Sequence, residues 1–424
     1  MSHPLDFTLI IFRGSPDDLQ SDGNSVILVD HDTQVLKHAD WMIEMGKGAG
    51  AEGGTIISQG TVEDISKNPE SVIGPYLSDH YESRIRPVTK REALFDKGAI
   101  HLETGAIHTV HPLDVRIPMG RLTVVTGVSG SGKTTMVLES LIPALRAEIS
   151  GQKLPSHVKK VEADGITQVK LIDATPIGIN VRSTVATYAN VHDGLRKVYA
   201  RTADAREHHY KAGDFSYNTG KLRCPTCDGT GEISLDVQFL PDVQIPCPDC
   251  RGSRYRKEAY DIHRKAKDGK EYSLPELMNM SVDQVLNALG GLKLLQQRLQ
   301  VLHDLGLGYL TLGEETPGLS GGEAQRLKLA SEMGKGQSDS VFVFDEPTIG
   351  LHPQDVRTLL HVFQTLIDHG ATLVVIEHDL DVIRNADYIV DMGPGGGKEG
   401  GRIIARGTPE EIRQNTDSLT GRFI

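Results

Sequence analysis

Residues 122–134 read LTVVTGVSGSGKT, an apolar run that passes into a turn of glycine and serine and ends at Lys133 and Thr134. The turn fits the pattern G-x-x-x-x-G-K-[ST], and the helix-forming run TTMVLESLI begins at Thr134. Glycines let such a turn wrap around phosphates, so that backbone N–H groups point inward at the start of a helix. The stretch therefore predicts a nucleotide site, rather than a loop that ends in Lys-Thr by chance.

Two side chains of this turn have distinct predicted roles. Lys133 reaches the β- and γ-phosphates of ATP, and the Thr134 hydroxyl ligates Mg²⁺. The residues predicted to bind ATP in the turn are Gly127, Ser129, Gly130, Ser131, Gly132, Lys133, Thr134 and Thr135.

Two further apolar runs end in groups that suit phosphate chemistry. Residues 341–347 read VFVFDEP, which predicts a buried parallel strand that ends in Asp345 and Glu346. Asp345 is predicted to bind ATP through Mg²⁺, and Glu346 to polarise the attacking water as a general base. Residues 373–379 read LVVIEHD and place His378 where it can bind the γ-phosphate. A strand capped by exposed acids and a structural histidine are the alternatives. Strands that alternate with helices indicate an α/β core with a parallel sheet.

The segment LSGGEAQR at 319–326 extends this set of motifs. With GVSGSGKT, LSGGEAQR, DEPTIGLH and IEHD in this order, the chain resembles an ABC-type ATPase. The segments at 175–188, 215–233 and 239–255 are similar to the UvrA family, the damage sensors of the ABC excinuclease, and residues 1–424 resemble the C-terminal half of such a protein. The signature residues that the resemblance implies are Ser320, Gly321, Gly322 and Glu323.

The resemblance implies an ATP hydrolase that uses ATP and Mg²⁺, holds Zn²⁺ and acts on damaged duplex DNA in nucleotide excision repair, with other excision-repair subunits as partners. Two alternatives stay open: a UvrA-like antibiotic self-resistance ATPase, and a non-hydrolysing zinc- and DNA-binding remnant of a truncated repair protein. ABC sites are composite, since one domain's phosphate loop faces another domain's signature. The resemblance therefore implies a second copy of the chain or a separate chain as partner. Ala174 stands where relatives have a glutamine that senses Mg²⁺ and the γ-phosphate, which favours slow hydrolysis.

An internal repeat defines the domain organisation. Residues 26–65 match residues 373–412 at a constant offset of 347, and a period this long indicates duplicated domains. The pairs that coincide include His31/His378, Asp40/Asp387, Gly46/Gly393, Gly54/Gly401 and Gly60/Gly407. The predicted domains are a remnant of a first ATPase domain at 1–69, a linker at 70–97, a second ATPase core at 98–136 and 319–424, and a signature and insertion domain at 137–318 with a zinc module at 221–257. The front of the first ATPase domain is expected to be missing from the chain.

All four cysteines of the chain lie close together in the sequence. Cys224-Pro-Thr-Cys227 and Cys247-Pro-Asp-Cys250 give C-x₂-C-x₁₉-C-x₂-C, a spacing typical of zinc sites. Four thiolates close a tetrahedral shell and leave no position for water, so the predicted zinc is structural. Reduced free thiols, a disulfide pair and the cysteine-rich region of a DnaJ-type chaperone are the alternatives.

The charge balance restricts nucleic-acid contact to local patches. Lys and Arg total 45 against 57 Asp and Glu, a net charge of −12, whereas residues 191–270 carry 15 basic and 12 acidic side chains. Tyr255 and Phe239 are interleaved with these charges and could stack on DNA, but a solvated face of mixed charge explains the same composition. The resemblance to the UvrA family implies that this zinc-bearing region contacts DNA, and it adds Arg182 from a matching segment. The residues predicted to contact DNA are Arg182, Lys221, Arg223, Arg254, Arg256 and Lys257. Since no run approaches the ~20 apolar residues of a membrane span, we expect a cytoplasmic protein with no membrane partner.

Overall fold

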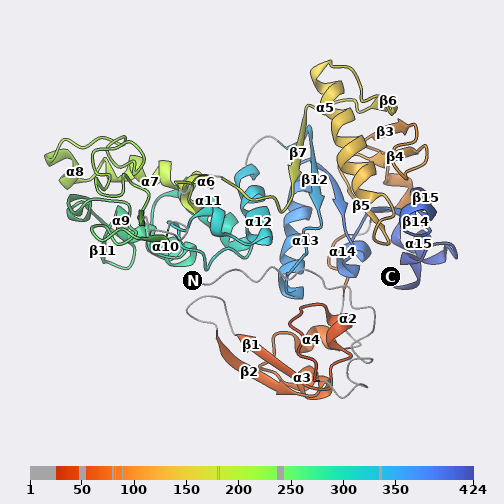
Figure 1. The fold of residues 1–424 in the computed structure, drawn as a ribbon, viewed down its shortest axis with the longest axis horizontal. Coiled ribbons are helices and arrows are strands. Elements are labelled where there is room, and N and C mark those ends of the chain that lie inside the picture. Colours follow the sequence, from red (N-terminus) through yellow and green to blue (C-terminus); the bar gives the residue numbers. More distant parts are fainter. Residues whose placement is uncertain are drawn as a thin grey trace.

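The computed structural model describes residues 25–46, 54–78, 81, 83–87, 89–178, 180, 182–235, 243–333 and 337–424. Phe239 and residues 47–53 of the first copy of the repeat lie outside these residues. Figure 1 shows a core built around one sheet, an insert beside it, and the first copy of the repeat as a smaller unit below the core. In the part of the chain that the structure describes, none of the helices has the length and apolar character needed to cross a membrane.

A six-stranded sheet forms the centre of the core, in the order β15-β14-β5-β13-β12-β7. Neighbouring strands are parallel, except that β15 pairs antiparallel with β14. Every residue of β5, β13 and β14 is buried, as expected for strands that are covered on both faces. The predicted α/β core is confirmed. Its strands are β5 (Leu122–Gly127), β7 (Gln168–Ile172), β12 (Ser340–Asp345), β13 (Thr372–Ile376), β14 (Tyr388–Gly393) and β15 (Arg402–Gly407).

Different layers cover the two faces of this sheet, because successive side chains of a strand point to opposite faces. On one face, Val125 and Val343 pack against the antiparallel sheet β4-β3-β6 and the helix after the phosphate turn. On the other face, Val124 and Phe344 pack in a core that continues into the insert. The first layer comprises β3 (Ala99–Thr104), β4 (Asp114–Pro118), a π-helix over Thr135–Leu141, α5 (Ile142–Ser150) and β6 (Val158–Glu162), and the second includes α13 (Pro353–Asp368) and α14 (Leu380–Arg384).

The insert begins later than predicted. Strands β6 and β7 belong to the sheets of the core, so the chain leaves the core after Ile172 and not at residue 137. The mostly apolar and polar helix formers of 283–305 would suit one helix, but Gly290 and Gly291, the latter with φ of 73°, divide this stretch into two. The elements from Thr184 onward are α6 (Val185–Tyr188), α7 (Val191–Tyr199), α8 (Ala203–Glu207), β8 (Glu232–Leu235), β9 (Val243–Pro246), β10 (His263–Lys265), β11 (Glu271–Ser273), α9 (Leu274–Met278), α10 (Val282–Ala288), α11 (Lys293–Asp304) and the signature helix α12 (Gly321–Glu332).

The two copies of the internal repeat share fine details of structure. Strands β1 and β2 pair as β14 and β15 do, and the ladders shift register at the equivalent residues Glu44 and Asp391. Thr61 caps α3 with a reciprocal pair of bonds, and its counterpart Thr408 caps α15 (Pro409–Gln414) in the same way. The first copy contains α2 (Thr33–Leu36), β1 (Met42–Gly46), β2 (Thr55–Gly60), α3 (Val62–Lys67) and α4 (Gly74–Leu77).

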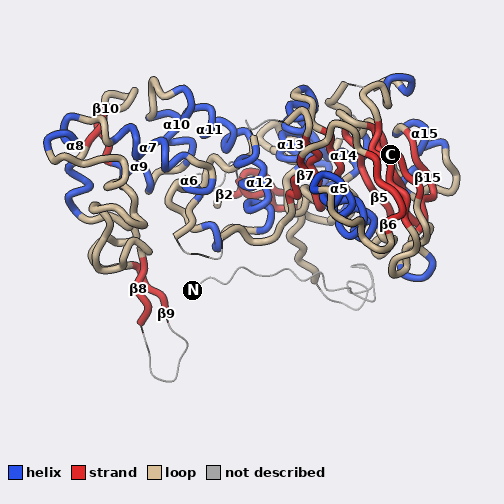
Figure 2. The backbone as a smooth tube through the Cα atoms, turned by 90° about the horizontal axis from the view of Figure 1, so that it is seen from above, coloured by secondary structure: helices blue, strands red, loops and turns tan. Residues whose placement is uncertain are grey.

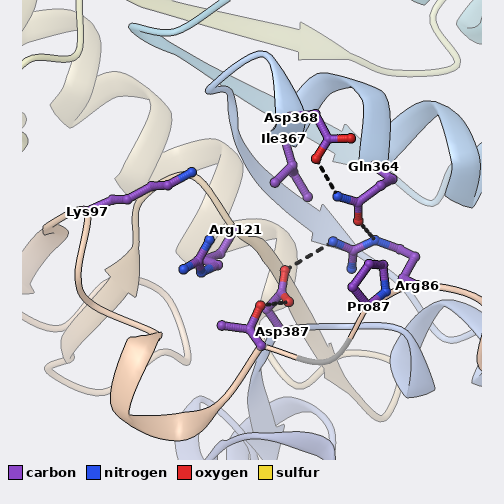
Figure 3. Close-up of a pocket in the computed structure, with 9 residues that line it drawn as sticks. Arg86, Pro87, Lys97, Arg121, Gln364, Ile367, Asp368 and Asp387 are labelled. Atoms are coloured by element: carbon purple, nitrogen blue, oxygen red, sulfur yellow. Dashed lines mark hydrogen bonds and ion pairs between the residues drawn. The ribbon is translucent and has the colours of Figure 1, made fainter.

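The segment predicted as a linker is docked on the core. Arg86 Nη2 and Asp387 Oδ2 form a buried ion pair at 3.2 Å, and Arg86 Nε donates to Gln364 at 3.1 Å. The hydroxyl of Thr89 and the backbone N–H of Leu122 also donate to Asp387. Figure 3 shows a cavity of about 410 Å³, and Arg86, Gln364 and Asp387 are among the residues that line it. It lies at the start of β5, so it is separate from the phosphate turn at the other end of that strand.

Candidate nucleotide site and zinc module

The phosphate turn has the backbone that its glycines predict. Gly127 and Gly132 have φ of 130° and 98°, which residues with a side chain rarely adopt. A side chain at Gly127 would collide with the carbonyl oxygen of Met392 on β14. Lys133 Nζ donates to the carbonyl oxygens of Gly127 at 2.9 Å and Val128 at 3.1 Å, and burial lowers the pKa of Lys133. The lysine would exchange these two bonds to reach a phosphate.

The hydroxyl groups of the turn differ in what they contact. Ser131 Oγ is buried and has no hydrogen-bond partner within the described residues. A buried hydroxyl without a partner is costly, which fits a polar ligand at the turn. Thr134 stands at the N-terminus of the helix that follows, whereas the Thr135 hydroxyl donates to Glu139 at 3.0 Å.

A second glycine-rich segment, residues 393–401, supports the turn. The backbone N–H groups of Gly397 and Gly401 donate to the carbonyl oxygens of Gly130 and Ser131, each at 3.0 Å. From the sequence, this segment was matched to the first copy of the repeat but had no predicted role. The spacing of its glycines could not predict that it contacts the phosphate turn, because the turn lies far away in the sequence.

The strand order β5-β13-β12 brings the predicted catalytic groups to one edge of the sheet. Asp345 ends β12, and Glu346 follows it with φ of 46°. Nε2 of His378, just beyond β13, lies 3.7 Å from Oε1 of Glu346. Burial and the charge of Glu346 raise the pKa of Asp345, while burial and the charge of Lys133 lower the pKa of His378. The imidazole is therefore neutral near pH 7, and Asp345 would gain from a nearby cation.

The signature helix α12 is capped by its own residues. The Ser320 hydroxyl accepts a bond from the Glu323 N–H at 3.4 Å, and the Glu323 carboxylate accepts one from the Ser320 N–H at 2.7 Å. Gln325, which had no predicted role, donates to the carbonyl oxygens of Ile172 and Asp345, each at 3.0 Å. The signature helix is thereby fixed to the ends of β7 and β12.

The signature helix and the phosphate turn adjoin different strands of the sheet. Strand β5 carries the turn, and it is three strand positions from β7, roughly 14 Å at ~4.8 Å per position. Among the described residues, Ser320 bonds Glu323 and Lys133 bonds the carbonyl oxygens of its own turn, and the two form no hydrogen bond with each other. Ala174 follows β7 and packs near the signature, since a Cβ atom at Gly321 would lie 3.2 Å from its Cβ. Its methyl group offers no oxygen or nitrogen to a metal or phosphate.

The four cysteines form one buried cluster with ligand atoms within 4.8 Å of one another. The Sγ atoms of Cys224 and Cys247 are 3.9 Å apart, and those of Cys227 and Cys250 are 3.6 Å apart. Tetrahedral zinc with bonds of ~2.3 Å separates its sulfurs by roughly 3.8 Å, so these residues fit the metal. Cys227 Sγ also accepts a bond from the N–H of Gly231 at 3.3 Å. When bound, zinc would cross-link the two knuckles, and both ends of the β8–β9 hairpin would be held.

Freshly purified protein is expected to contain about one zinc per chain. Cys247→Ser removes a thiolate from the closed shell and should lower the zinc content several-fold, because three thiolates hold the metal less well. Elemental analysis would measure this, with Ser253→Ala as a control outside the cluster. Less than half an equivalent of zinc in the parent chain would contradict the assignment.

All four arginines predicted to contact DNA form ion pairs within the insert. Arg182 and Arg223 each pair with Asp228 at 2.8 Å. Arg254 is buried, and its Nη2 pairs with Glu315 at 2.6 Å, five residues before the signature serine. A buried guanidinium cannot contact DNA, so Arg254 instead joins the zinc module to the segment that leads to α12. Charge in the sequence does not distinguish such an internal arginine from a surface one.

The other predicted contacts are on the surface. Lys221, Arg256 and Lys257 are exposed, and the first two lie 3.9 Å from Asp214 and 3.5 Å from Glu258 respectively. Tyr255, which precedes Arg256 in the sequence, is instead fully buried, and its hydroxyl forms a hydrogen bond with His192 at 2.8 Å. The prediction that Tyr255 stacks on DNA is therefore wrong.

The strand order, the phosphate turn and the acids that face it define an ABC-type P-loop ATPase domain. No family model matches the chain. UvrABC system protein A of Lactococcus lactis is 43% identical over 406 residues, which are 95% of this chain and 42% of that protein. The Aquifex aeolicus protein of the same name is 41% identical over 427 residues, 100% of this chain and 45% of its own length. The crystal structure of UvrA2 from Deinococcus radiodurans matches with a TM-score of 0.85 and 37% identity, over 96% of this chain and 48% of that one.

The chain is therefore a homologue of UvrABC system protein A, as its motifs predicted. It spans less than half the length of these relatives.

Proposed function

We propose that this chain is a UvrA-like ATPase of the cytoplasm that binds ATP, Mg²⁺ and Zn²⁺ and acts on damaged DNA in nucleotide excision repair. The observation that supports this most directly is the convergence of Lys133, Asp345, Glu346 and His378 at one edge of the sheet, in a homologue of UvrABC system protein A. Other excision-repair subunits would be its partners.

Each side chain at this edge has a proposed part in hydrolysis. Lys133 exchanges its bonds to the turn for bonds to the β- and γ-phosphates, and His378 contacts the γ-phosphate as a neutral imidazole. Glu346 accepts a proton from the attacking water. Mg²⁺ would neutralise charge on the phosphate oxygens, and Thr134 and Asp345 would hold it.

The first copy of the repeat supports a proposal about what covers its exposed apolar residues. Ile27 and Val29 are 92% and 74% exposed, whereas their counterparts Val374 and Ile376 are completely buried. In the second copy, β5 lies between β13 and β14 and covers these positions. The described residues place no equivalent of β5 beside Ile27. We propose that a polypeptide with the front half of an equivalent cassette, on this protein or on a separate chain, covers this apolar face.

The zinc module is the proposed DNA-binding part. Figure 2 shows that strands β8 and β9 project from the body of the insert, and in the sequence Cys227 precedes β8 and Cys247 follows β9. Exposed Lys221, Arg256 and Lys257 would contact phosphates directly. Arg182 and Arg223 would do so by exchanging Asp228 for a phosphate.

One observation favours a second candidate function. Because Ala174 cannot coordinate Mg²⁺ or phosphate, the chain could bind zinc and DNA without hydrolysing ATP. A UvrA-like self-resistance ATPase is the third candidate, which would hydrolyse ATP without a need for DNA.

Steady-state ATP turnover with and without lesion-bearing duplex distinguishes these functions. The repair function predicts turnover that rises severalfold with damaged duplex and less with an undamaged duplex of the same sequence. Turnover that DNA does not change would support the self-resistance ATPase instead. DNA binding without turnover, in protein whose zinc content is intact, would support the non-hydrolysing remnant.

A further inference from the structure

Glu377 is a buried carboxylate between the end of β13 and His378, and its side chain connects two loops of the nucleotide site. One oxygen accepts bonds from the backbone N–H of Thr348 at 3.0 Å and from the Thr348 hydroxyl at 2.5 Å. The other oxygen accepts bonds from the N–H groups of His378 at 2.6 Å and Asp379 at 3.0 Å. Four donors therefore converge on one carboxylate that is 2% exposed.

These donors belong to the segments that carry Glu346 and His378. Thr348 lies two residues after Glu346, and the Glu346 N–H donates to the carbonyl oxygen of Ile376 at 3.0 Å. Glu346 has a left-handed backbone, with φ of 46°, which persists only where its surroundings hold it. The Glu377 carboxylate and the Ile376 carbonyl hold it from both sides.

The first copy of the repeat has the same arrangement around its histidine. Asp30 occupies the position equivalent to Glu377, and Asp30 Oδ1 accepts bonds from the N–H groups of His31 at 2.7 Å and Asp32 at 2.9 Å. An acid that binds the two following N–H groups therefore recurs in both copies, although Asp30 is exposed and Glu377 is buried.

We propose that Glu377 is a positioning residue, which fixes the geometry between the general base Glu346 and His378 and so governs the chemical step. This proposal rests on the proposed ATPase function. Binding of nucleotide depends on Lys133 and the phosphate turn, to which the Glu377 side chain makes no hydrogen bond among the described residues. A shift of about 1 Å at a catalytic group can cost roughly 100-fold in rate, so loss of this carboxylate should lower turnover more than affinity.

The Glu377→Gln variant tests one half of the arrangement. The glutamine amide can keep its oxygen towards the N–H groups of His378 and Asp379. Its NH₂ group, a donor, then faces Thr348. The Thr348 hydroxyl can rotate to accept a bond from this NH₂ group, but the Thr348 backbone N–H is itself a donor and cannot. The Thr348 N–H thereby loses its acceptor. Glu377→Ala removes the acceptor for all four donors.

Turnover, affinity for a fluorescent ATP analogue, and amide hydrogen exchange are to be measured on the full chain. For Glu377→Gln we expect turnover to fall about tenfold or more, affinity to stay within about twofold, and exchange to accelerate at Thr348 but not at His378. Glu44→Gln is the matched control, because Glu44 also accepts two backbone N–H groups, those of Val72 and Ile73, and the Ser71 hydroxyl, in the first copy. It should leave turnover unchanged.

Parental turnover in Glu377→Gln would overturn the proposal, as would equal losses of turnover and affinity. If the parent chain has no turnover at any concentration, the proposed ATPase function of this chain fails, and exchange alone then decides whether Glu377 fixes the geometry of the two loops. Faster exchange at Thr348 in the variant would still support it, and unchanged exchange there would overturn it.

Discussion

Replacement of Glu346 by Gln is expected to lower ATP turnover by about 100-fold or more and to leave ATP bound. Glutamine has the size of glutamate but cannot take a proton from water, so the chemical step loses its base. Lys133 and the phosphate turn are unchanged in this variant. Burial and the charge of Glu346 both raise the pKa of Asp345, and removal of that charge also reduces repulsion of the triphosphate.

The comparison variant is Lys133→Ala, which should abolish ATP binding, because it removes the buried ammonium group at the turn. Glu410→Gln, a partly exposed acid that pairs with Arg84 at 2.6 Å, controls for the loss of one carboxylate elsewhere. Single-turnover rates together with retention of labelled ATP would measure both effects. Hydrolysis at the parental rate in Glu346→Gln would show that another group activates the water.

The parts of the site that the sequence predicts are those whose chemistry is local. The phosphate turn and the acid pair at Asp345 each fit within a few residues of an apolar strand, and the structure has both strands buried and parallel. The closure of β5, β13 and β12 into one sheet then brings Lys133, Glu346 and His378 together without further information. The apolar pattern of each strand and the motif that follows it are sufficient to predict these three side chains, because each of them lies at the end of one strand.

The parts that could not be predicted from the sequence depend on contacts between distant segments. Strand β7 pairs with β12, 172 residues further along the chain at the first pair, so nothing near Gln168 marks it as part of the core. Arg254 has the composition of a DNA contact but is buried against Glu315. Glu377 lies in the motif IEHD, in which only His378 has a predicted role. Two of the four hydrogen bonds that Glu377 accepts come from Thr348, which belongs to another loop, so the sequence could not predict them.

The ATPase activity of the isolated chain is expected to rise with its concentration, because a complete site needs two chains. The signature helix is fixed to β7 and β12, three strand positions from β5, so Ser320 would have to face Lys133 of another copy. Specific activity across a hundredfold range of concentration would measure this dependence. The exposed face around Ile27 can hinder the approach of two copies if it remains uncovered, and Ala174 should keep even the dimer slow.

A mixture of two inactive variants provides the sharper test of a shared site. Lys133→Ala removes the phosphate contact, and Ser320→Asp keeps an N-cap for α12 but places a negative charge where the γ-phosphate of the partner's site would lie. Each variant alone spoils both sites of a symmetric dimer. In a random equal mixture, half of the dimers are mixed and each has one site with both halves intact, so about a quarter of the parental activity should return. Unchanged melting temperatures would show that both variants fold. No recovery on mixing, together with constant specific activity on dilution, would mean that the site does not form between two copies of this chain, and a separate polypeptide would have to supply the opposing signature.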